Sequence, residues 1–319
     1  MSKFVAVCLV GVGTLLVLTS LPVIAGDGED KQASKLAVAF LKAVREKDLA
    51  SILRHSGTPW LDPYEERVIK DGAELRRSWE DRLPFLNPSR IPEAKEVASV
   101  AFSEFRMPPA KSGDDEFDAF VREQHESVVR DLDRVLAPTD RIVTAWDKFS
   151  HEGRVVFVRS RDGRAEIVGG PIGLGYLRCA NRIPRRAREL LEKAQRFELF
   201  SIEPRRSEEK PADEFHGWEI LGRTEIAPGM DRNRIVISLK QSVEEGGDAF
   251  AGCFNPRHAI RVTVDGKTAD LAICFECNSI LVYFDEDADS QVQISDSAQS
   301  TFDDILRAAK VPLAEKAKR

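Results

Sequence analysis

Four residues in the C-terminal half of the chain have types and spacing that could do chemistry. They are Cys253, His258, Cys274 and Cys277. Thiolate and imidazole groups are the ligands that zinc prefers, and paired thiols form disulfides in an oxidising compartment. The four residues are therefore candidates for a metal site, a disulfide or a reactive thiol.

A predicted hairpin brings these residues together. Residues 264–267 read Val-Asp-Gly-Lys, and Asp-Gly between two apolar runs is a strong signal for a two-residue hairpin turn. The register that follows from this turn places Ile273 opposite His258. Extended further, it places Cys253 near Cys277. Three sulfurs and one imidazole are thus expected within one small region.

Several roles for this cluster stay open. A disulfide from Cys253 to Cys277 or Cys274 would close a loop and stabilise the fold by roughly 3 to 4 kcal/mol in the chain-entropy model. A zinc site would instead use all four residues, Cys253, His258, Cys274 and Cys277, as ligands. Side chains three residues apart in an unbroken strand point to opposite faces, so this site requires a turn at residues 275–276. A third role is reactivity, either as a Cys-x2-Cys redox pair or through Cys253 activated by His258. A redox pair of this spacing normally lies at a helix N-terminus, whereas the context here is a strand. Unpaired, buried thiols complete the alternatives.

The start of the chain predicts export. Residues 1–3 carry one positive charge, residues 4–18 are apolar, and small residues precede a cut after Ala25. This order is typical of a cleavable secretory signal over residues 1–25. The alternative is an uncleaved membrane anchor, because the apolar stretch has about the 20 residues that a spanning helix needs. Pro22 favours cleavage, so we expect a periplasmic or secreted protein that is not inserted in the membrane.

Composition excludes some partners. The chain carries 47 basic and 53 acidic residues, a net charge of −6, and its basic clusters are short and flanked by acids. A nucleic-acid binder concentrates basic charge on one face, so no nucleic-acid partner is expected. An apolar content of 42% supports hydrophobic cores, and the length suits two domains.

Residues 31–180 predict helices followed by a curved antiparallel sheet. Leu36, Phe40 and Val44 recur at helical spacing, a long amphipathic helix is expected over residues 114–137, and short strands over 142–146, 155–158 and 165–168. The pattern Ala37-x2-Phe40-x2-Ala43-x4-Asp48 resembles the opening of the NTF2-like cone fold. The resemblance implies a pocket between sheet and helices, bordered by His125, that serves small-ligand binding, assembly or, in some members, catalysis.

Residues 181–195 predict a connecting helix, and residues 196–314 a second α+β domain with an antiparallel sheet. Strands are expected over 197–202, 219–226, 259–264, 268–275 and 279–284, with helices over 235–245 and 298–310, the latter capped by Ser297. The domain resembles an uncharacterised domain of exported bacterial proteins. The residues that carry the resemblance are Phe215-His216-Gly217-Trp218, Cys253-Phe254-Asn255-Pro256-Arg257-His258, Cys274-Phe275-Glu276-Cys277 and Phe302-x3-Leu306-x4-Val311-Pro312-Leu313-Ala314. This family brings no known activity.

The sequence as a whole predicts an exported two-domain α+β protein. We expect a non-enzymatic binding or assembly module of the cell envelope that has no cofactor and whose partner is a small ligand or an envelope protein. The alternative is an enzyme, either a zinc-dependent hydrolase that uses the Cys/His cluster or an activity in the N-terminal pocket.

Overall fold

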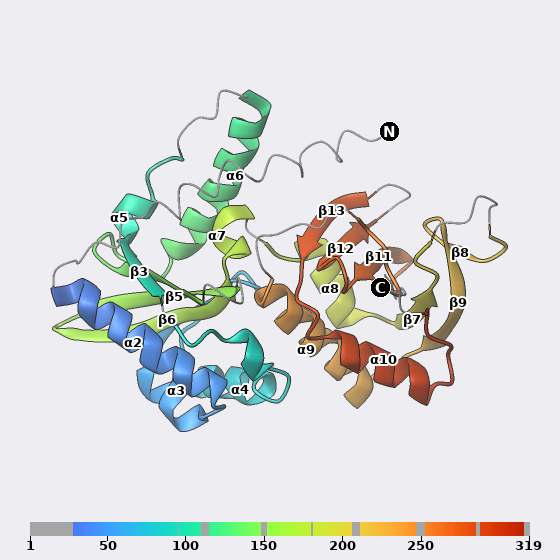
Figure 1. The fold of residues 1–319 in the computed structure, drawn as a ribbon, viewed down its shortest axis with the longest axis horizontal. Helices are drawn as coiled ribbons and strands as arrows, with labels where there is room; N and C mark the ends of the chain where they lie inside the picture. The colour runs from blue at the N-terminus through green and yellow to red at the C-terminus, as the bar shows by residue number, and fades with distance from the viewer. Residues whose placement is uncertain are drawn as a thin grey trace. The chain divides into compact units, whose positions relative to one another are not determined.

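The computed structural model describes residues 28–94, 96–109, 115–147, 152–179, 181–205, 211–246, 253–284 and 288–315. The predicted secretory signal, residues 1–25, lies outside the described residues. The chain forms two compact units (Figure 1). The N-terminal unit contains the chain up to Asn181 and residues 244–248, and the C-terminal unit contains residues 182–243 and 249–319.

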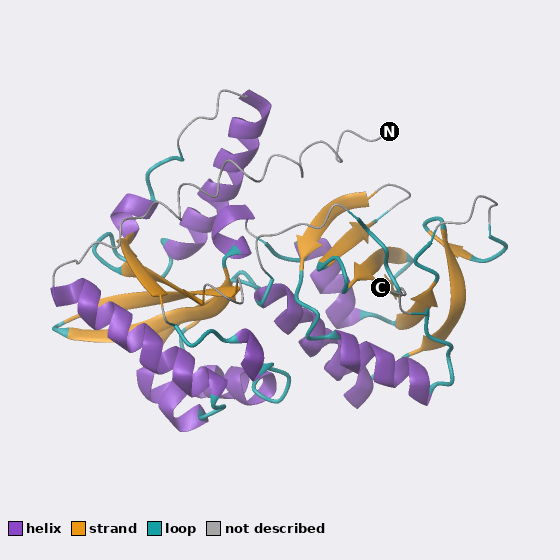
Figure 2. Ribbon diagram, in the orientation of Figure 1, coloured by secondary structure: helices purple, strands orange, loops and turns teal. Residues whose placement is uncertain are grey.

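A six-stranded sheet forms the centre of the N-terminal unit (Figure 2). Its order is β2-β1-β6-β5-β4-β3. The strands are β1 (Ser56–Asp62), β2 (Arg67–Ile69), β3 (Glu96–Ala101), β4 (Arg141–Asp147), β5 (Glu152–Arg161) and β6 (Arg164–Gly173). Strands β4, β5 and β6 form the expected antiparallel meander. The sheet is nevertheless mixed, because β1 pairs with β6 in parallel.

Helices cover both faces of this sheet. They are α2 (Gly28–Arg45), α3 (Leu49–His55), α4 (Gly72–Arg82), α5 (Phe102–Phe105), α6 (Asp115–Leu132) and α7 (Gly175–Cys179). Asp48 caps α3 by accepting a hydrogen bond from Ser51 N at 3.1 Å, and Asp71 caps α4 through Ala73 N at 3.0 Å. The long helix α6 ends five residues earlier than the sequence predicts.

Two apolar clusters form the N-terminal core, one on each face of the sheet. The first packs α2, α3 and α4 on the sheet through Phe40, Trp60 and Trp79, whose ring centroids lie 5.9 to 6.1 Å apart. The second packs α6 and α7 around Phe157 and Tyr176. All five rings are buried, so aromatic side chains fill the space between this sheet and its helices.

A curled seven-stranded antiparallel sheet forms the C-terminal unit, in the order β13-β12-β11-β10-β7-β9-β8 (Figure 1). The strands are β7 (Arg196–Ile202), β8 (Glu214–Phe215), β9 (Trp218–Glu225), β10 (His258–Val264), β11 (Lys267–Cys274), β12 (Ser279–Tyr283) and β13 (Ala288–Gln293). In the β10–β11 hairpin, Val264 pairs with Lys267 and His258 with Ile273, which confirms the predicted register.

The described part of the C-terminal unit also contains the helices α8 (Arg185–Lys193), α9 (Met230–Glu244) and α10 (Gln299–Ala308). Helix α9 begins five residues before the predicted start. The cap prediction for Ser297 is wrong: Ala298 precedes α10 without a side-chain cap, and the Ser297 hydroxyl contacts Ser295 Oγ at 2.7 Å. The short strand β13 was not predicted, because its residues alternate weakly between apolar and polar.

Candidate functional site

Two of the predicted cysteines lie at the end of the β11–β12 hairpin. Cys274 is the last residue of β11, and Cys277 lies in the turn that joins it to β12. Asn278 completes this turn with a left-handed φ of 51°. The chain therefore turns at residues 275–276, and Cys277 N donates a hydrogen bond to Cys274 Sγ at 3.1 Å.

Cys253 joins this pair from the segment that precedes β10. Its Sγ lies 3.2 Å from Cys277 Sγ, as the hairpin register predicts. Cys253 is exposed, whereas Cys274 and Cys277 are buried, and all three are free thiols. Arg257 donates to Glu276 at 2.7 Å, so a second contact holds the Cys253 segment against the turn.

The electrostatics of the thiols favour their protonated forms. The hydrogen bond with Cys277, and then burial, raise the pKa of Cys253. Burial, and then the hydrogen bond with Cys274, raise the pKa of Cys277. Because the thiolate is the nucleophile and the metal ligand, reactive cysteines normally have lowered pKa values. At neutral pH the two closest sulfurs therefore carry a smaller thiolate fraction than an ordinary cysteine.

His258 does not join the sulfurs. In the ladder it shares a sheet face with Ile273, whereas Cys274 points to the other face. Its Nε2 lies 2.8 Å from Asp303 Oδ1 on α10, and its ring packs against Phe302 with centroids 5.9 Å apart. The four residues predicted as zinc ligands therefore do not converge, and the described residues contain no group of three or more His, Cys, Asp or Glu side chains arranged to hold a metal ion.

A second polar cluster lies on the face of the C-terminal sheet to which Cys274 points, opposite His258. His216 occupies the β8–β9 turn with a left-handed φ of 49°, and its Nε2 lies 2.8 Å from Asp270 Oδ2 on β11. Its ring stacks on Tyr283 of β12, with centroids 3.8 Å apart and an interplanar angle of 15°. Arg261 of β10 donates to both Asp270 oxygens, at 2.8 and 2.6 Å. The turn of an edge hairpin thus reaches across the curled sheet to its central strands.

Charge pairing dominates this second cluster. Burial alone would raise the pKa of Asp270, but hydrogen bonds from Arg261 and His216 outweigh it and lower that pKa. The hydrogen bond to Asp270 raises the pKa of Arg261. The sequence carried part of this signal, because the predicted hairpin register already places Arg261 opposite Asp270. The sequence could not place His216, because β8, the strand that precedes it, has only two residues.

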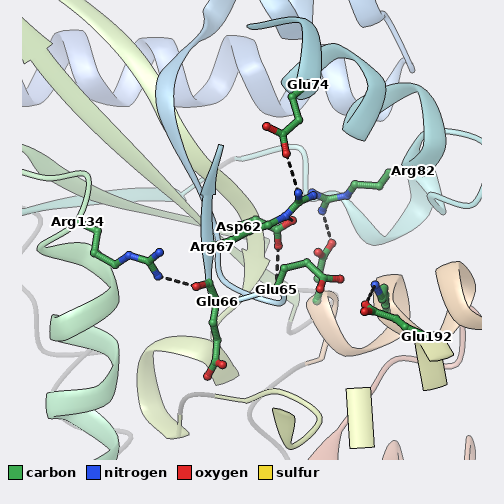
Figure 3. A network of polar contacts seen from close by, with 10 residues as sticks. Asp62, Glu65, Glu66, Arg67, Glu74, Arg82, Arg134 and Glu192 are labelled. Atoms are coloured by element: carbon green, nitrogen blue, oxygen red, sulfur yellow. Dashed lines mark hydrogen bonds and ion pairs between the residues drawn. The ribbon is translucent and has the colours of Figure 1, made fainter. Parts of the chain in front are cut away.

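A third network surrounds the β1–β2 turn (Figure 3). Arg67 Nη1 lies 2.7 Å from Glu74 Oε1, and Asp62 Oδ1 accepts a hydrogen bond from Glu65 N at 3.2 Å. Arg134 Nη1 donates to the main-chain oxygen of Glu66 at 2.6 Å. The basic side chains of this network point at acidic side chains or main-chain oxygens, which is the arrangement of a structural network.

The resemblance to the cone fold implied a pocket between sheet and helices, bordered by His125, and the N-terminal unit offers two observations to set beside it: the contacts of His125 and a hollow on the surface. His125 Nε2 lies 2.7 Å from the main-chain oxygen of Phe105, and the two rings are 5.1 Å apart, so this histidine packs on α5. A surface hollow of about 420 Å³ lies at the tip of the β5–β6 hairpin. It is lined by Arg161, Asp162, Arg164 and Glu166.

Within the part of the chain that the structure describes, no helix has the length and apolar character needed to cross a membrane. Comparison with known proteins found no matching family model, no matching curated protein and no matching solved structure.

Proposed function

We propose that the protein is an exported binding or assembly module of the cell envelope, and that a Cys253–Cys277 disulfide staples its C-terminal unit. The single observation that carries the proposal is the 3.2 Å separation of the two Sγ atoms. A disulfide bond is about 2.0 Å long, so a small side-chain movement joins them. The predicted secretory signal supplies the oxidising compartment that such a bond needs.

The staple would fix a segment that covers one end of the curled sheet. Phe254 follows Cys253 and packs on Trp218 of β9, with ring centroids 5.7 Å apart. Both rings belong to the apolar cluster that also contains Phe200 and Tyr283. A bond at Cys253 would therefore hold Phe254 in this cluster, and the bond would stabilise the unit by about 3 to 4 kcal/mol.

Structural contacts of the reactive groups support a binding role rather than catalysis. The pKa values of Cys253 and Cys277 are raised, which lowers the thiolate fraction at neutral pH. His258 is 3% exposed and points at Asp303, so a substrate does not reach its ring. His216 is committed to Asp270 and Tyr283, an arrangement that holds a hairpin in place.

The test is intact mass and peptide mapping of the protein recovered from the envelope fraction of cells that export it. We expect a chain that lacks residues 1–25 and is lighter than the reduced form by two hydrogen atoms. Mapping without reduction should recover peptides of Cys253 and Cys277 joined together. The Cys274→Ser variant is the matched control and keeps the bond, whereas Cys253→Ser loses it. Protein that retains its leader and carries three alkylatable thiols at these positions would overturn the proposal.

Zinc bound at the three sulfurs is the outcome that competes with the staple, although these sulfurs do not form a group arranged to hold a metal ion in the described part of the chain. The same preparation distinguishes the two. One equivalent of zinc that Cys274→Ser abolishes, together with free thiols after chelation, would support the metal site and exclude the staple.

A further inference from the structure

Strand β9 forms an edge of the C-terminal sheet that its hairpin partner covers only at one end. Strand β8 pairs with Trp218 and Glu219 alone, and β7 pairs with the other side of β9 from Ile220 to Glu225. Ile220 N also donates on this side, to Asp213 O at 3.1 Å, and among the described residues no strand pairs with the outer side of β9 beyond that contact. An edge of this kind is a template for pairing with another strand.

The register shows which main-chain groups face outward. Ile226 N donates to Phe197 O of β7 at 2.7 Å, and Glu225 pairs with Glu198 as the next rung of the ladder. Because the bonded positions of an antiparallel pair alternate, residues 226, 224 and 222 face β7. The N–H and C=O groups of Arg223 and Glu225 therefore face away from the sheet.

We propose that this edge binds the same edge of a second copy of the chain, in an antiparallel arrangement centred on Thr224. In this register Arg223 of each copy lies opposite Glu225 of the other. On each side of Thr224, Arg223 of one copy and Glu225 of the other form a hydrogen-bonded pair and exchange two main-chain hydrogen bonds. The interface thus contains four main-chain hydrogen bonds and two cross-strand Arg–Glu pairs, which a two-fold axis relates.

The side chains of this edge have partners within the chain that the exchange would replace, and the Arg223 guanidinium also lies 5.8 Å from the centre of the Phe200 ring. Arg223 is 47% exposed and pairs with Asp213 at 2.8 Å, and Glu225 is 66% exposed and lies 3.9 Å from Arg196. Exposed ion pairs of this kind contribute little, so the cost of replacing them is small. In the symmetric register the opposite charges meet, which selects a second copy as the occupant.

The opposite edge of the sheet lacks this complementarity. Ile294 N donates to Asn278 O, so the alternation turns the main-chain groups of Asp289, Gln291 and Gln293 of β13 outward. These three residues include one acid and no base, so a second copy of this edge would meet no opposite charge. The inference thus selects β9, and it does not depend on export, because the same edge exists in either compartment.

The test is sedimentation equilibrium of the chain without residues 1–25 over a series of concentrations up to its solubility limit. We expect a concentration-dependent dimer. The Arg223→Glu and Glu225→Arg variants each place like charges opposite one another and should raise the dimer Kd at least about tenfold, and the double variant should restore it. Circular dichroism melts of each variant check that the fold is kept.

The matched control is Arg234→Glu, which reverses an exposed charge paired with Asp231 on α9 and should leave the dimer unchanged. A chain that stays monomeric at every concentration overturns the inference. A dimer that is indifferent to both single variants, or that the double variant fails to restore, overturns it as well.

Discussion

The Asp270 carboxylate should hold the β8–β9 hairpin against the central strands, and Asp270→Asn tests this. The variant keeps the shape of the side chain but removes the charge that two Arg261 nitrogens and His216 contact. Removing one partner of a fully buried ion pair costs about 3 to 5 kcal/mol. Arg261 is 34% exposed, and solvent screening lowers the expected loss to about 2 to 3 kcal/mol at pH 7.

The contribution of the Asp270 charge to the unfolding free energy should depend on pH in a defined direction. The pKa of Asp270 is lowered in the folded chain, so the unfolded chain binds a proton first as the solution becomes acidic. Its contribution is therefore fully present above the unfolded value of about 3.9 and is lost as pH falls through the folded pKa. The difference in unfolding free energy between wild type and Asp270→Asn should shrink below about pH 4.

The assay is hydrogen-exchange mass spectrometry of peptides from β10 and β11 in increasing urea, from pH 7 to pH 3. The matched control is Asp304→Asn, which loses an exposed pair with Arg307 and should cost less than about 0.5 kcal/mol. A loss below about 1 kcal/mol for Asp270→Asn would refute the magnitude. A difference that persists unchanged in acid would refute the assignment to the Asp270 charge.

Three further outcomes are expected. Trp79→Ala should lower the unfolding free energy of the N-terminal unit by about 3 to 5 kcal/mol in urea titrations, because this buried ring contacts Phe40 and Trp60; a loss near 1 kcal/mol would contradict that packing. Gly170→Ala should cost about 2 kcal/mol or more, since the added Cβ meets Val155 O at 2.5 Å at a φ of +101°, and an unchanged melting temperature would contradict it. Reducing agent should destabilise the exported protein by about 3 to 4 kcal/mol but leave Cys253→Ser unchanged, and equal responses would argue against the staple.

Local signals predicted much of the fold. The Asp-Gly turn at residues 265–266 fixed the β10–β11 register residue by residue, because a two-residue loop allows one pairing. Apolar spacing predicted the helix α2 and located α10 to within a few residues. Pairings between distant segments were not predictable in this way. The parallel β1–β6 contact joins strands about 100 residues apart, and no local pattern encodes it.

The His216 cluster shows a second limit of local prediction. Its hairpin lies at one edge of the sheet, yet the His216 ring stacks on β12, which is near the other edge. This contact exists because the sheet curls, and curl is a property of the whole sheet rather than of any segment. The left-handed φ of His216 has a local cause, because His216 and Gly217 form a two-residue hairpin turn in which both residues have positive φ.

The predicted Cys/His cluster divides because of the alternation of side chains along a strand. Proximity along the ladder correctly placed Cys253 beside Cys277, but proximity does not determine the sheet face. Since Ile273 and His258 form one rung, the next residue, Cys274, must point to the opposite side, and the sheet separates the His258 imidazole from the Cys274 sulfur. The same register that brought the four residues together therefore also placed His258 and Cys274 on opposite faces. A ligand set proposed from a hairpin should be tested for face as well as for distance.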